Sequence, residues 1–166
     1  ENRIRFVSER ELISEDLIFN LRFLQYAGRV VFLPDVSYFY CTNPLSLSKS
    51  RRTDRFLRDC ELFVSVRKML AETYEERDFL LYLQRLLISR ARFDIMQEAA
   101  YHDQIGSKSG CYGIVKKIAE EPLLQKALER YPLRKLPKAQ GLFAFLLKRK
   151  QVRLLVFLAR LRRIFS

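Results

Sequence analysis

The chain has 166 residues, of which 49% are hydrophobic and 30% are charged, with 31 Lys and Arg against 19 Asp and Glu. This length can form one hydrophobic core, and the balance is typical of a globular protein rather than a disordered one. Only five glycines argue against a β-rich fold, and no apolar run reaches the length of about 18 residues that a membrane-spanning helix needs. We therefore expect a mainly α-helical fold.

The first predicted helix covers residues 17–27 and begins at an acidic pair. Ser14 is a favoured N-cap residue, and Glu15 and Asp16 lie where carboxylates interact with unpaired amides and the positive end of the helix dipole. Apolar residues at helical spacing predict one buried face, made of Leu17, Phe19, Leu21, Phe23 and Leu24. Capping alone is therefore one explanation of the acidic pair.

Three short segments around this helix have the pattern of β-strands. They are residues 3–7, the β-branched run 30–33 before Pro34, and residues 37–41, which alternate as a strand does. A polar loop follows over residues 42–50. We expect a small β element of two or three strands beside the helix, with exposed apolar surface that pairs with a second copy or is poorly ordered.

The order of acidic helix start, helix, strand and the sequence YFYCTNPLSLS resembles the C-terminal part of the catalytic domain of bacterial family 2 glycosyltransferases. These inverting enzymes build cell-surface polysaccharides such as capsule and O-antigen. The resemblance covers about a third of the chain, residues 2–55, and implies that Asp16 is the general base. It implies that Glu15 holds an acceptor hydroxyl or acts on Asp16 by like-charge repulsion. The implied substrate-binding residues are Tyr40, Asn43, Ser46 and Ser48; Cys41 stands where the family has an arginine.

These residue types suit an inverting transfer, because one carboxylate must take the proton from the acceptor hydroxyl as its oxygen attacks the anomeric carbon. The family's nucleotide-binding strands and its metal-binding Asp-x-Asp motif are absent from these 166 residues. We therefore expect an inactive fragment that holds no metal itself. The complete enzyme would use Mg²⁺ or Mn²⁺, a nucleotide-sugar donor and a saccharide or lipid-linked acceptor. The alternative is a non-enzymatic helical module that binds a membrane or a partner protein.

From residue 51 onward the pattern predicts helix after helix. Two apolar stripes, over residues 52–74 and 79–100, predict helix-to-helix packing. Their members are Leu57, Leu62, Phe63, Val66 and Leu70, then Phe79, Leu80, Leu83, Leu86, Leu87, Ala91 and Ile95. Residues 106–110 are predicted to join two helices, and the next helix, residues 111–131, to break at Pro122. The sequence thus predicts a catalytic-domain end at residues 1–50 and a helical bundle at 51–131.

The single histidine and the cysteines suggest no catalytic or metal site. No motif places a nucleophile beside His102, so we expect it on the surface or in a loop. Cys41, Cys60 and Cys111 lack metal-ligand spacing, and we expect buried thiols in a reducing cytosol.

The last predicted domain, residues 132–166, carries most of the net charge. Residues 130–166 contain 11 Lys and Arg and no acidic residue. A helical wheel over residues 141–165 places Arg149, Arg153, Arg160 and Arg163 on one side. The apolar side has Phe143, Leu147, Leu154, Phe157, Leu158, Leu161 and Phe165. This pattern predicts one basic amphipathic helix.

Such a helix suits three kinds of contact. An anionic membrane attracts the basic residues while the apolar face enters the acyl boundary, and packing on the preceding helices or on another subunit is the alternative. Nucleic acid would leave the apolar face uncovered, so we expect no nucleic acid. We favour a peripheral protein on the cytoplasmic face of the cell membrane, and a homodimer stays open. The expected membrane-binding residues are Arg149, Arg153, Phe157, Arg160, Leu161 and Arg163.

Overall fold

The computed structural model describes residues 4–6, 8, 14–36, 38–39, 52–107 and 109–164, with side chains in the last helix as far as Leu161. The chain divides into two compact units, Glu1–Asp54 and Arg55–Ser166. This boundary lies close to the one expected at residue 50. The expected domains 51–131 and 132–166 belong to a single unit.

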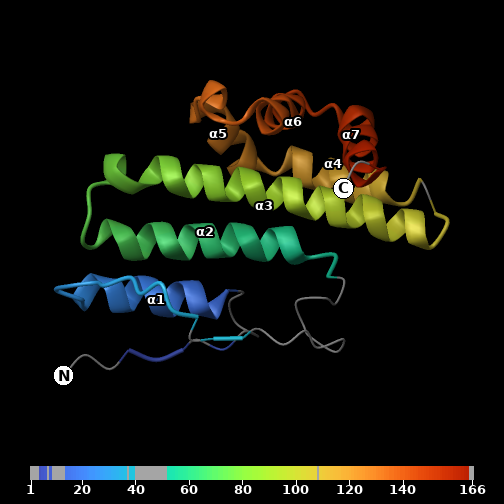
Figure 1. Ribbon diagram of the computed structural model, residues 1–166. Coiled ribbons are helices and arrows are strands. Elements are labelled where there is room, and N and C mark those ends of the chain that lie inside the picture. The colour runs from blue at the N-terminus through green and yellow to red at the C-terminus, as the bar shows by residue number, and fades with distance from the viewer. Residues whose placement is uncertain are drawn as a thin grey trace. The chain divides into compact units, whose positions relative to one another are not determined.

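The first unit contains helix α1, Glu15–Tyr26, which begins slightly before the predicted start (Figure 1). Ser14 occupies the N-cap position as expected, but its side chain makes no capping hydrogen bond. The buried face is smaller than predicted, because Ile18 is the buried residue of α1 whereas Phe23 and Leu24 are exposed. The ring of Phe19 stacks on that of Phe6, with centroids 4.1 Å apart.

The predicted β element is not supported. None of the described residues within the three segments, at 4–6, 30–33 and 38–39, lies in a strand. Phe32 is 91% exposed and Phe39 is 80% exposed, so the alternating side chains cover no core. A β-branched run forms a stable strand only with neighbouring strands that satisfy its backbone and cover one face. The expected exposed apolar surface is confirmed.

The second unit is a bundle built around one long helix. Its helices are α2 Arg55–Ala71, α3 Glu76–Gln104, α4 Cys111–Glu120, α5 Pro122–Arg130, the 3-10 helix η2 Leu133–Lys135, α6 Lys138–Lys148 and α7 Val152–Ile164. Helix α3 contacts α2, α4, α5, α6 and α7. Figure 1 shows α2 along one side of α3 and the later helices along the other. The prediction of a mainly α fold is confirmed.

The core follows most of the predicted stripes. In α3, five predicted residues are buried: Phe79, Leu83, Leu87, Ala91 and Ile95. The buried residues of α3 cover about half of its circumference, because it packs on both sides. In α2, Leu62, Phe63 and Val66 are buried as predicted, but Leu57 is exposed and Phe56 is buried in its place.

The predicted breaks on either side of α4 are confirmed. Helix α3 ends at Gln104 and α4 begins at Cys111, and Gly106 between them has a φ of +70°. Pro122 is the first residue of α5, where its missing N–H is not needed. The Glu121 carboxylate caps this helix by accepting a hydrogen bond from the Leu123 amide at 3.4 Å.

The predicted single C-terminal helix is two helices, which corrects the sequence interpretation. Helix α6 ends in a Schellman motif, in which the Lys150 amide donates to Leu147 O at 2.9 Å and the Gln151 amide donates to Leu146 O at 3.0 Å. Lys150 has a φ of 52°, the left-handed conformation that glycine usually supplies. Because the chain turns here, α6 and α7 each have their own buried side.

Candidate functional site

The acidic pair lies in the first turn of α1. Asp16 is exposed and Glu15 is half-buried. The Asp16 carboxylate Oδ1 accepts a hydrogen bond from the Leu17 amide at 2.8 Å. This contact lies within the first turn of the helix, and the Asp16 side chain stays accessible to solvent.

The other residues of the expected sugar site lie outside the described part of the chain. These are Tyr40, Asn43, Ser46 and Ser48, together with Cys41. Within the described residues, no group of three or more His, Cys, Asp or Glu side chains is placed to hold a metal ion. Of the residues expected to form a sugar site, the structure therefore describes only the acidic pair.

The exposed sides of α6 and α7 are together called the C-terminal face here. Its apolar side chains are between 39% and 58% exposed: Leu142, Phe145, Leu154, Phe157 and Leu161. Its exposed basic residues are Lys148, Arg149, Lys150 and Arg153. The Arg149 Cζ lies 5.7 Å from the centroid of the Phe145 ring, so cation and ring form one surface.

The opposite sides of these helices belong to the core. The buried residues there are Phe143, Ala144, Leu146, Leu147, Leu155, Val156 and Ala159. Phe143 and Leu147, which the helical wheel assigned to the same face as Phe157, are therefore core residues. Phe157 and Leu161 are exposed, so the helix pair both packs on the bundle and presents apolar surface to solvent.

Arg160 is partly buried and forms an ion pair. Its Nε is 2.9 Å from the Asp103 Oδ1, and its side chain is only 25% exposed. This ion pair joins α7 to the end of α3, so Arg160 already has an acidic partner, and its expected membrane contact stays a prediction. Arg163 belongs to α7, but its side chain lies outside the described part.

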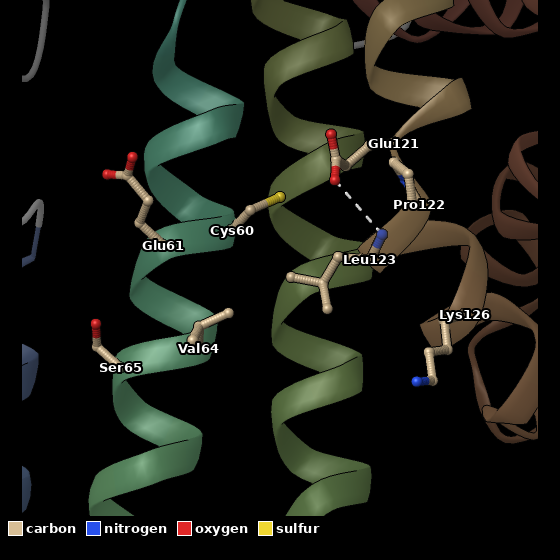
Figure 2. A pocket seen from close by; sticks show the side chains of 8 residues that line it. All are labelled: Cys60, Glu61, Val64, Ser65, Glu121, Pro122, Leu123 and Lys126. Atoms are coloured by element: carbon tan, nitrogen blue, oxygen red, sulfur yellow. Dashed lines mark hydrogen bonds between the residues drawn. The ribbon is translucent and has the colours of Figure 1, made fainter.

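A pocket of about 670 Å³ opens where α2 faces the start of α5, and Figure 2 shows its lining. Cys60 and Val64 point toward Glu121 and Leu123, whereas Glu61 points away. Burial first, and then the charge of Glu121, raise the pKa of Cys60 to about 12. A protonated thiol is a poor nucleophile, and Glu121 caps α5. Neither group is prepared for catalysis.

Two buried carboxyl groups, which the sequence pattern did not predict, lie between α2 and α3. Asp59 is 3% exposed and Asp94 is 5% exposed. Burial first, and then the charge of Asp59, raise the pKa of Asp94 to about 7. Burial also raises the pKa of Asp59, although the charge of Arg90, whose Nε is 3.6 Å from the Asp59 Oδ1, opposes the shift. The pair can share a proton near neutral pH.

The expectation of a surface histidine is wrong. His102 is buried in α3, and its Nε2 lies 3.7 Å from the Glu98 Oε2 one turn earlier. The turn before α4 covers the imidazole so closely that a Cβ at Gly110 would collide with it. Cys60 and Cys111 are buried thiols as expected.

No family model, curated protein or solved structure matches this chain. Among the helices in the described ranges, none combines the length and the apolar composition needed to cross a membrane. The C-terminal face exposes both basic and large apolar side chains.

Proposed function

We propose that the C-terminal face docks this chain on an anionic membrane surface. The observation that carries the proposal is the mixture of exposed large apolar side chains and exposed basic residues on α6 and α7. Each basic residue near an anionic leaflet contributes about 1 kcal/mol, and apolar side chains gain by leaving water at the acyl boundary. In the cell, this proposal places the chain on the cytoplasmic face of the membrane.

The exposed apolar side chains favour a lipid over a nucleic acid, because the basic residues suit either ligand. Residues 130–166 contain no acidic side chain that would repel a phosphate surface. A nucleic acid could pair with Arg149 and Arg153, but Phe157 and Leu161 would stay in water. The other sides of both helices pack on the bundle, so this packing does not account for the apolar side chains on the exposed sides.

Co-sedimentation of the full chain with vesicles tests this proposal. We expect binding to vesicles that contain phosphatidylglycerol, weak binding to pure phosphatidylcholine, and release as salt approaches about 1 M, where the Debye length is about 3 Å. Reversal of Arg149 and Arg153 to Glu should abolish binding. Equal binding to both vesicles, or binding to neither, would reject membrane docking.

Apolar substitutions separate docking from folding. Phe157→Ser with Leu161→Ser should weaken vesicle binding and change the melting temperature little, because both side chains are exposed. The matched control is Leu155→Ser on the buried side of α7, which should lower the melting temperature strongly. A large loss of stability from the exposed pair would instead indicate a protein contact.

A second proposal concerns the acidic pair: the chain is the acceptor-side portion of an inverting glycosyltransferase, with Asp16 as general base. It is supported by the exposed Asp16 beside Glu15 at the start of α1, together with the sequence resemblance. A donor-binding half would supply the nucleotide-sugar and metal sites.

The test requires a protein that includes the donor-binding half. Asp16→Asn should remove nearly all transfer and leave donor binding unchanged, because the base acts on the acceptor in the transition state. Glu15→Gln should have a smaller effect. A full transfer rate in Asp16→Asn would mean that the acidic pair only caps the helix. Loss of a cap costs about 1 kcal/mol of stability.

A further inference from the structure

A hollow of about 580 Å³ lies between α4 and α7. Its lining consists of Tyr112, Gly113 and Lys116 from α4 and Val152 and Arg153 from α7. Two cations and a phenol hydroxyl line it, and none of these five residues is acidic. The chemistry of the lining therefore suits an anion with several oxygen acceptors.

The two cations are available to a ligand. Arg153 is exposed and forms no ion pair with another described residue. The Lys116 Nζ lies 3.9 Å from the Glu120 Oε1 at an exposed site, where such a pair contributes little. A bound anion would therefore compete with water more than with a protein carboxylate.

Gly113 is the glycine in the lining of the hollow. Glycine is disfavoured inside helices, and neither backbone strain nor crowding requires it here, because a Cβ at Gly113 would meet no atom within 4 Å. A larger side chain at this position would enter the hollow without displacing the fold. The position therefore offers a direct way to fill the hollow while every charge is kept.

The hollow adjoins the C-terminal face. Arg153 lies four residues before Phe157, so the two side chains are neighbours along α7. A lipid whose headgroup entered the hollow would have its acyl chains beside the exposed side chains of Leu154 and Phe157. A phospholipid could thus place its phosphate beside the cationic side chains and its acyl chains beside the apolar ones.

We propose that this hollow binds the headgroup phosphate of an anionic phospholipid. Lys116 and Arg153 supply the positive charges, and the Tyr112 hydroxyl donates a hydrogen bond to a phosphate oxygen. The inference rests on the proposed membrane docking and adds a defined site to a diffuse attraction between charges.

Vesicle binding by the full chain tests the site, with phosphatidylglycerol in phosphatidylcholine as the probe. Gly113→Leu fills the hollow at constant charge and should lower the affinity about tenfold, whereas Gly113→Ala should stay within about twofold of the natural chain. Lys116→Gln should also lose about tenfold. Lys117→Gln removes the same charge from an exposed residue outside the lining and should lose about threefold or less.

The outcomes separate the site from the docking proposal. If the natural chain binds anionic vesicles and Gly113→Leu binds equally well, the headgroup site is wrong and membrane docking stands. If the natural chain binds no anionic vesicle, both proposals fail. If millimolar inorganic phosphate raises the melting temperature of the natural chain but not of Gly113→Leu, while vesicle binding is equal, the hollow takes free phosphate and the lipid assignment is overturned.

Discussion

The buried acid pair predicts that Asp94→Asn changes the pH dependence of stability. Asp94 lies between α2 and α3, where burial and the charge of Asp59 raise its pKa from 3.8 to about 7. Between these values the folded chain keeps a proton that the unfolded chain releases. Stability therefore falls as pH rises from about 4 to about 7 and changes no further above that through this group.

The size of the effect follows from the pKa of Asp94. At about 1.4 kcal/mol per pH unit, a rise from 3.8 to about 7 corresponds to at most about 4 kcal/mol of unfolding free energy. The amide of Asp94→Asn loses no proton and can donate to the Asp59 carboxylate. We therefore expect the unfolding free energy of the variant to rise relative to that of the natural chain by about 2–3 kcal/mol between pH 5 and pH 8.

Urea unfolding at several pH values measures this difference. The variant and the natural chain share every other titrating group, so their difference isolates the pair. Asp78→Asn is the matched control, because its side chain lies on the same helix and is 61% exposed; its effect should be small and independent of pH. Parallel stability curves for Asp94→Asn and the natural chain would refute the reasoning.

Four further substitutions test the packing of the bundle, each by urea unfolding. Lys150→Gly should keep or raise stability, by up to about 1 kcal/mol, because glycine adopts the left-handed turn freely; an unstable variant would contradict the Schellman motif. Leu87→Ala, at a fully buried site, should lower the free energy of unfolding by about 2–5 kcal/mol. A smaller loss would contradict a core position for Leu87. Gly110→Ala should lower the free energy of unfolding by about 1–3 kcal/mol, because its Cβ would collide with the His102 ring. Gly113→Ala, whose Cβ lies in open space, should raise it by up to about 1 kcal/mol. Equal effects of the two substitutions would argue against the close turn.

The helices predicted from the sequence were most accurate where apolar residues repeat at helical spacing over several turns. Phe79 through Ile95 repeat at helical spacing over several turns, and this pattern does not depend on other parts of the chain. The strands failed because residues 30–33 have only a local β preference, which needs partner strands. The turn at Lys150 was hidden because no glycine or proline marks it.

The sequence contains a weak indication that Asp59 and Asp94 are buried, which is their helical spacing from apolar residues. Asp59 stands three residues after Phe56 and four before Phe63, so it lies on the buried stripe of α2. Asp94 follows Ala91 by three residues in the same way. Sequence alone could not show that the two carboxyls share one interface, because that depends on how α2 and α3 pack. The hollow between α4 and α7 was hidden for the same reason.

The central position of α3 has a consequence for synthesis on the ribosome. Its 29 residues span about 44 Å, and only α2 of its partners in the bundle precedes it in the chain. The side that α4, α5, α6 and α7 cover stays without its partners until α7 has emerged, which takes several seconds at about 5–20 residues per second. During this interval a long helix with an uncovered apolar side is exposed to solvent, so the nascent chain should be a substrate for chaperones that hold exposed hydrophobic segments.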